Sequence, residues 1–174
     1  SSGKYELAIV LPDERQTALN LLALSIIINI FFFFLSLLIA FLFIKNFNLK
    51  IIFLFIPFGI FIESIISSIN QYNNRNKKYK YMSVIKIFRS IIVTLLQILF
   101  YHYGIENFGL LWGVIIGSFI SLLFLIIPHY QILINTFRDL IKNELLVVAK
   151  NYIRFPKFQA FSAFLNAISQ NSIL

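Results

Sequence analysis

Long uncharged runs dominate the hydrophobic pattern of this chain. No Asp, Glu, Lys or Arg lies between Arg15 and Lys45, or between Glu106 and Arg138. A helix needs about 20 apolar residues to cross the hydrocarbon core of a bilayer, and each of these runs is longer than that. The pattern therefore predicts an all-α, polytopic membrane protein.

The lengths of the apolar runs and the polar breaks between them predict four membrane-spanning helices. We expect them at about residues 19–44, 49–71, 84–103 and 108–128. Residues 1–18 are interpreted as a cytoplasmic loop that ends in the start of the first helix. Residues 131–157 place apolar side chains at helical spacing with most charges on other faces, which predicts an amphipathic linker on the cytoplasmic surface. Residues 158–174 begin another apolar run, expected to be the truncated start of a further membrane helix.

Composition and charge fit a membrane environment. Hydrophobic residues make up 59% of the chain and charged residues 13%, which leaves too little polar surface for a soluble protein. The net charge of +8 lies in short clusters between the apolar runs, so we expect no nucleic-acid partner. All Lys and Arg residues except Lys45 and Lys50 fall on one side of the predicted topology. Because cytoplasmic loops are enriched in Lys and Arg, we expect both ends of the chain in the cytoplasm.

Glu63 is the first candidate functional residue, because a charge at the centre of a membrane span costs at least about 2.5 kcal/mol. Ser67 and Asn70 follow at helical spacing and share a polar stripe with it. One hypothesis is that the stripe lines a water-accessible cavity that binds a polar substrate or a coupling cation. The alternative is a polar seam that joins helices, or a carboxylate that reaches the interface. The sequence leaves both interpretations open.

Two further features concern the backbone. Pro57 removes a hydrogen-bond donor from the second predicted span, which predicts a bend in its first half and makes Pro57 a candidate hinge. Proline is also common in membrane helices without any mechanical role. Gly109, Gly113 and Gly117 repeat every four residues and form a smooth groove along the fourth span. They predict close packing of helices within one bundle, in preference to dimerisation.

Lys86 and Arg89 lie about one turn apart at the expected cytoplasmic start of the third span. They are candidates for binding a phosphate or pyrophosphate group, with anionic lipid as the alternative ligand. The neighbouring basic stretch, residues 75–80, is more typical of an orientation signal and of phospholipid contact than of a substrate site.

The sequence contains no recognisable catalytic constellation. Nucleotide-binding glycine motifs, the G-x-S-x-G nucleophile motif and the H-E-x-x-H zinc motif are all missing. His102 and His129 fall at opposite faces of the predicted membrane, so they cannot share a metal ion. We therefore predict that the protein is not an enzyme and has neither a metal site nor a cofactor.

Several segments together resemble the polysaccharide transporters of the O-antigen and capsule flippase family, within the multidrug/oligosaccharidyl-lipid/polysaccharide flippase superfamily. Residues 5–12, with Ala18 and residues 22–25, resemble the loop before the third helix of that family. Its basic loop between helices four and five and its glycine-bearing sixth helix look like residues 74–80, Gln97, Gly109, Gly113 and Gly117. The entry to its seventh helix is similar to residues 152–157, with Asn166 and Ser169.

The resemblance implies a fragment that covers about helices three to six, and the start of seven, of a two-lobed transporter in the bacterial inner membrane. Such proteins carry undecaprenyl-pyrophosphate-linked oligosaccharide repeat units to the periplasmic leaflet by alternating access, for O-antigen, lipopolysaccharide or capsule. Arg89 is then expected to meet the pyrophosphate, and Ser67, Asn70 and Gln97 the sugar. The expected partners are this lipid-linked substrate, membrane lipids and other polysaccharide assembly proteins, with protons or sodium ions as the coupling ion.

Three alternatives to this function remain. The first is a cation-coupled exporter of drugs or other amphiphiles from the same superfamily. The second is an integral-membrane polymerase or ligase for lipid-linked glycans, which requires catalytic residues in large periplasmic loops. The loops near Asn46 and at residues 104–107 are short, which disfavours that reading. The third is a purely structural membrane subunit.

Overall fold

The part of the chain that the structure describes is helical, with short turns between helices. The computed structural model describes residues 5–47, 51–104, 108–131, 133–134 and 142–153, and contains no strand within these ranges. Its elements are α1 (Tyr5–Ala8), α2 (Arg15–Phe47), η1 (Ile51–Leu54), α3 (Phe55–Arg75), α4 (Tyr79–His102), α5 (Gly109–Ile126), η2 (Ile127–His129) and α7 (Lys142–Asn151). The predicted all-α helical bundle is therefore confirmed for these residues.

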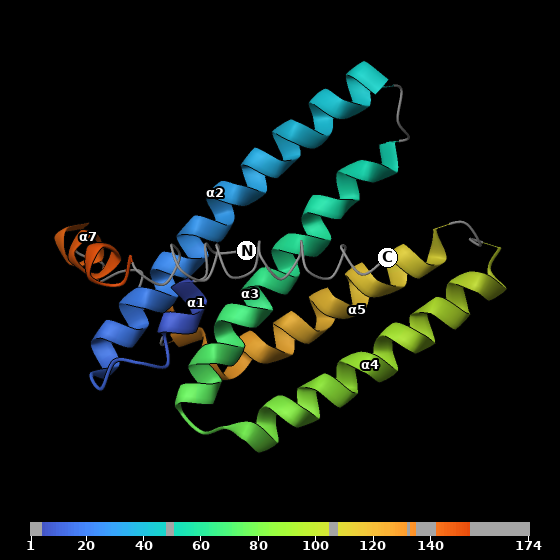
Figure 1. Ribbon diagram of the computed structural model, residues 1–174. Helices are drawn as coiled ribbons and strands as arrows, with labels where there is room; N and C mark the ends of the chain where they lie inside the picture. Colours follow the sequence, from blue (N-terminus) through green and yellow to red (C-terminus); the bar gives the residue numbers. More distant parts are fainter. Residues whose placement is uncertain (1–4, 48–50, 105–107, 132, 135–141, 154–174) are drawn as a thin grey trace, which may run out of the picture.

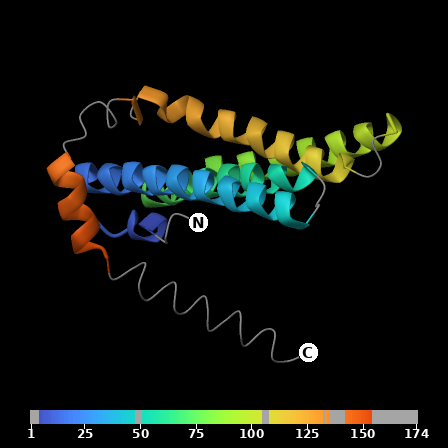
Figure 2. The ribbon, with the colours of Figure 1, turned by 90° about the horizontal axis from the view of Figure 1, so that it is seen from above.

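Four long helices lie side by side in the spatial order α2, α3, α5, α4 (Figure 1). Because the chain reverses direction at each turn, α3 and α5 run the same way, and α2 and α4 run the opposite way. Helix α5 lies between α3 and α4, so α4 packs mainly on α5 and meets α3 in few places. The short helix α7 lies across the end of α2 (Figures 1 and 2).

Three of the described helices are long and apolar enough to cross a membrane. They are Arg15–Lys45, Tyr79–His102 and Gly109–His129, which match the first, third and fourth predicted spans. The second predicted span, 49–71, corresponds to α3. Its 21 residues give a length of about 31 Å, which is long enough to cross a membrane. Its polar residues, however, leave it less apolar than the other three helices. A membrane crossing by α3 therefore stays a prediction. The place of α3 between α2 and α5 agrees with such a crossing.

Helix α4 begins earlier than the sequence predicted. Its first residue is Tyr79, five residues before the expected start at Val84. At a rise of about 1.5 Å per residue, Arg89 lies about 15 Å along the helix, near the middle of α4. Whether Arg89 lies at the cytoplasmic start of the membrane-spanning part of α4 stays a prediction, because a helix can begin before it enters a membrane.

Pro57 lies in the first turn of α3, directly after the 3-10 turn η1. Proline fits there because the first-turn N–H groups of an α-helix have no intrahelical partner. Helix α3 then continues unbroken from Phe55 to Arg75. Pro57 therefore marks the start of α3 and not a bend further along the helix. Its role as a hinge stays a prediction.

The three glycines of α5 face α4. A Cβ atom added to Gly109, Gly113 or Gly117 would come within 2.8 Å of a side-chain atom of α4. The facing residues of α4 are, in the same order, Phe100, Gln97 and Val93. Real Cβ atoms are essentially never that close to another heavy atom, so glycine is what permits this separation of the two helices.

Helices α2 and α3 are joined by a buried polar seam. The hydroxyl of Ser64 donates a hydrogen bond to Oδ1 of Asn29 at 2.5 Å, and Nδ2 of Asn29 donates to the hydroxyl of Ser68 at 3.5 Å. Asn29 and Ser68 are both buried. Their polar groups satisfy each other between the helices, as polar residues in apolar surroundings must.

The ends of α1, α2, α3 and α7 meet at one end of the bundle. Arg75, the last residue of α3, donates hydrogen bonds to the carbonyls of Pro12 and Asp13 at 2.8–3.2 Å. The hydroxyl of Tyr5 in α1 donates to the carbonyl of Ala149 in α7 at 3.2 Å, and Val148 is buried against α2. Helix α7 is the described part of the predicted amphipathic linker, and its place on a membrane surface stays a prediction. The rest of that linker is described only at 131, 133–134 and 152–153, and the predicted last segment, 158–174, lies outside the described residues.

Candidate functional site

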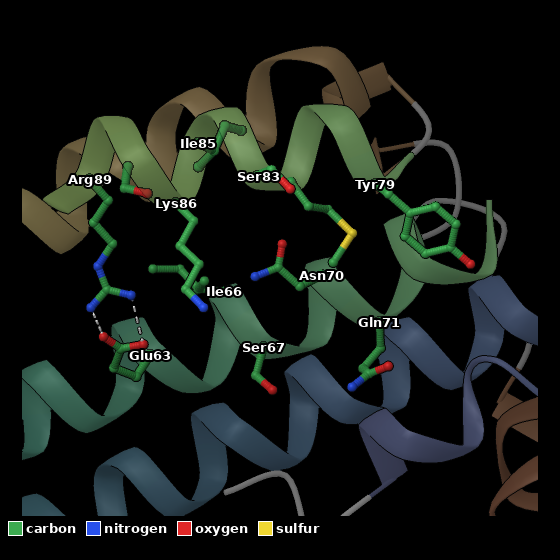
Figure 3. Close-up of a pocket in the computed structure, with 12 residues that line it drawn as sticks. Glu63, Ile66, Ser67, Asn70, Gln71, Tyr79, Ser83, Ile85, Lys86 and Arg89 are labelled. Atoms are coloured by element: carbon green, nitrogen blue, oxygen red, sulfur yellow. Dashed lines mark hydrogen bonds and ion pairs between the residues drawn. The ribbon is translucent and has the colours of Figure 1, made fainter. Parts of the chain in front are cut away.

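A polar pocket of about 470 Å³ lies between α3 and α4, with α5 behind it. Figure 3 shows its lining side chains, which come from the facing sides of α3 and α4. The polar residues that line it are Glu63, Ser67, Asn70, Gln71, Tyr79, Ser83, Lys86, Arg89 and Ser121. It exists because α5 separates the other two helices, so polar side chains occupy a space that apolar packing leaves open.

The pocket runs from the turn between α3 and α4 to the middle of the bundle. Gln71 and Tyr79 line it near the turn, and Glu63 and Arg89 line its deep end. Glu63 lies about 12 Å from the start of α3, near the middle of the helix. The pocket therefore carries polar groups from one end of the bundle to its middle.

Glu63 and Arg89 form an ion pair across this deep end. Nη1 of Arg89 donates to Oε2 of Glu63 at 3.1 Å, and Nη2 pairs with Oε1 (Figure 3). Nη2 also donates to the hydroxyl of Ser118 on α5, at 2.9 Å. The guanidinium thus connects all three helices around the pocket, and each charge of the pair has a partner.

The remaining charge of the pocket belongs to Lys86. Its side chain extends into the space between α3 and α4, near Asn70 (Figure 3). The ionised residues of the lining are Glu63, Lys86 and Arg89, so the pocket carries a net positive charge when the ion pair is intact. Amide and hydroxyl groups on α3, from Ser67 and Asn70, face the same space. A positive site with neutral hydrogen-bonding groups beside it suits a ligand that is both anionic and rich in hydroxyls.

A second, mostly apolar groove of about 580 Å³ lies on the other side of the ion pair. It runs between α3 and α5 towards the opposite end of the bundle, past Phe55, Gly59 and Leu111. Glu63 and Ser67 line both hollows. The ion pair therefore marks the boundary between a polar half and an apolar half of the space around α3.

The structure brings together four of the five residues that the sequence singled out for substrate or cavity contact. Glu63, Ser67, Asn70 and Arg89 line one pocket. Gln97 does not, because its amide donates to the carbonyl of Leu110 at 3.2 Å and its side chain packs against Gly113. Gln97 is therefore placed to join α4 to α5, and the substrate contact expected for it has no counterpart among the described pocket residues.

Sequence reasoning missed the contribution of α5 to this site. Ser118 and Ser121 lie three residues apart in an otherwise apolar helix, so they share a face, and both are buried next to the pocket. That spacing was a signal that the sequence offered.

Among the described residues, no group of three or more His, Cys, Asp or Glu side chains is arranged to hold a metal ion.

Comparison with known protein families gives one match. The model of a family described as "polysaccharide biosynthesis protein" matches residues 16–173, which is nearly the whole chain. No curated protein and no solved structure matches the chain.

Proposed function

Because the chain belongs to the polysaccharide biosynthesis protein family, we propose that it is part of a transporter that moves lipid-linked oligosaccharides across a membrane. In this proposal the cargo is an undecaprenyl-pyrophosphate-linked repeat unit for O-antigen, capsule or a similar surface polysaccharide. The observation that carries the proposal is the polar, positively charged pocket that reaches the middle of apolar, membrane-length helices.

The pocket addresses the main physical obstacle to this transport. A sugar head group with a charged pyrophosphate does not cross hydrocarbon unaided, because stripping its water costs far more than thermal energy supplies. Lys86 offers a cation to the pyrophosphate, while Ser67 and Asn70 offer hydrogen bonds to sugar hydroxyls. These groups replace part of the lost hydration at membrane depth.

The charge distribution supports an orientation for the pocket in this proposal. The pocket opens near the α3–α4 turn, where Arg75, Lys77, Lys78 and Lys80 gather. Cytoplasmic loops are enriched in Lys and Arg, so this proposal places that opening at the cytoplasmic face of the bacterial inner membrane. The head group enters there, and alternating access, driven by a proton or sodium gradient, then exposes it to the periplasm. The protein acts as a carrier and not as an enzyme.

The test replaces pocket residues in a strain that lacks the chromosomal copy of the gene. Lys86→Ala removes the free cation of the pocket and is expected to lower surface polysaccharide about tenfold, the effect of losing one charge-assisted contact. The lipid-linked repeat unit should build up in the cytoplasmic leaflet. Lys80→Ala is the matched control, since it removes an exposed lysine of α4 that does not line the pocket. Normal surface polysaccharide in the deletion strain, or an equal effect of both variants, would contradict the proposal.

A further inference from the structure

Glu63 occupies the position where an anionic ligand of Arg89 would bind. Its carboxylate accepts hydrogen bonds from both terminal nitrogens of the guanidinium, the arrangement in which arginine also binds phosphate. We propose that Glu63 is a built-in counter-anion, which an anionic head group must displace from Arg89 and which then returns to promote release. This inference rests on the proposed function, because it assigns Glu63 a role in tuning that same pocket.

The two members of the ion pair are held unequally. The Arg89 side chain is 25% exposed and donates a further hydrogen bond, to the hydroxyl of Ser118 on α5. The Glu63 side chain is 47% exposed, and within the described part of the chain its side-chain hydrogen bonds are those from Arg89. When the carboxylate turns away, the guanidinium stays anchored on α5 and presents its released donors to the pocket. Glu63 is therefore the mobile partner, and Arg89 is the fixed receptor.

Lys86 favours the displacement of Glu63 from Arg89 by an incoming anion. It lines the same pocket about one turn before Arg89, and no carboxylate among the described residues forms a salt bridge with it. An anion drawn to Lys86 repels Glu63 and attracts Arg89. With the anion gone, the nearby carboxylate restores the original pair. A carrier site must bind its cargo and also let it go, and an internal competitor lowers affinity towards that balance.

The alternative is that the ion pair only holds α3 to α4. That role predicts that loss of the Glu63 charge loosens the bundle and leaves anion affinity unchanged or weaker. The counter-anion role predicts tighter anion binding when the competitor is removed. The two roles therefore give opposite signs for one measured quantity.

The experiment measures binding of inorganic pyrophosphate, by calorimetry, to the protein in nanodiscs of zwitterionic lipid. Glu63→Gln keeps the shape of the side chain and removes its charge, and it is expected to bind pyrophosphate about tenfold more tightly than the wild type. Glu14→Gln makes the same change in net charge at an exposed position outside the pocket, and it should stay within about twofold of the wild type. Glu63→Asp keeps the charge but shortens its reach, and should give an intermediate gain if the Gln variant does not fold.

The outcomes separate this inference from the proposed function. Wild-type binding together with equal or weaker binding by both Glu63 variants would overturn the counter-anion role and leave the anion site standing. No pyrophosphate binding by the wild type or by any variant would overturn the proposed anion site itself. Equal tightening by Glu14→Gln would show that net charge alone is responsible, which also overturns the role of Glu63.

Discussion

Replacement of Gly117 by alanine tests how closely α5 packs on α4. The added Cβ atom would lie 2.5 Å from Cγ2 of Val93, and 3.2 Å from both the Cα and the backbone nitrogen of Val93. Favourable carbon contacts lie at about 3.5–4.0 Å. Rotation of the Val93 side chain relieves the first contact but not the two backbone contacts, so α4 must move by a few tenths of an ångström. Overpacking of this kind costs about 1–3 kcal/mol.

Thermal unfolding of the purified protein in detergent measures this cost. We expect Gly117→Ala to lower the melting temperature by about 4 °C, from about 2–4 °C per kcal/mol for chains of this size. Gly59→Ala is the matched control, because its Cβ atom would meet its nearest neighbour, Cγ1 of Ile115, at an ordinary 3.8 Å. Alanine also forms helices more readily than glycine, so the control should keep or slightly raise the melting temperature. Equal melting temperatures for the two variants would refute the close approach of α4 and α5.

Two further predictions concern one end of the bundle and its topology. Arg75→Ala removes the hydrogen bonds to the carbonyls of Pro12 and Asp13, so we expect the free energy of unfolding to fall by about 1–2 kcal/mol, measured by thermal unfolding. Lys77→Ala is the nearby control. Equal melting temperatures of both variants would argue against this contact. Because the chain has no Cys, single cysteines at Asn76 and Tyr103 can be labelled without background. A membrane-impermeant maleimide should reach them from opposite sides of intact cells, with Asn76→Cys labelled only after lysis, and labelling of Asn76→Cys in intact cells would reverse the proposed topology.

The sequence was sufficient to predict the helices but less able to predict their ends. Uncharged runs reveal α2 and α5 because hydrocarbon excludes charge, and the apolar run after Arg89 reveals α4. The same rule does not locate the first residue of α4, because backbone hydrogen bonds continue the helix through Lys80 and Lys86. Pro57 was interpreted as a bend within a helix. Proline in a first turn is equally compatible with a helix start, and in the structure Pro57 lies in the first turn of α3.

The candidate site was predicted in part. Helical spacing placed Glu63, Ser67 and Asn70 on one face, but spacing within a helix says nothing about which face of another helix it meets. The pairing of Glu63 with Arg89 was therefore missed. A signal for it existed, because the two residues lie at equal distances along the chain from Asn76, at the turn between antiparallel helices, and so at equal depth. The place of α5 between α3 and α4 had no such signal, since it depends on packing along the whole bundle.

The position of α4 at the edge of the bundle has a consequence for molecules that are anchored in lipid. Its outward face carries Ile87, Ile91, Leu95 and Ile98, each more than half exposed, while its other side borders the polar pocket. An α-helix with its side chains is about 10 Å wide, so the pocket is only one helix away from the acyl chains. Under the proposed function, a head group reaches the pocket on a short tether while its hydrocarbon anchor stays dissolved in the bilayer. Extracting that anchor into water would cost about 0.8 kcal/mol for every methylene, and this geometry makes the extraction unnecessary.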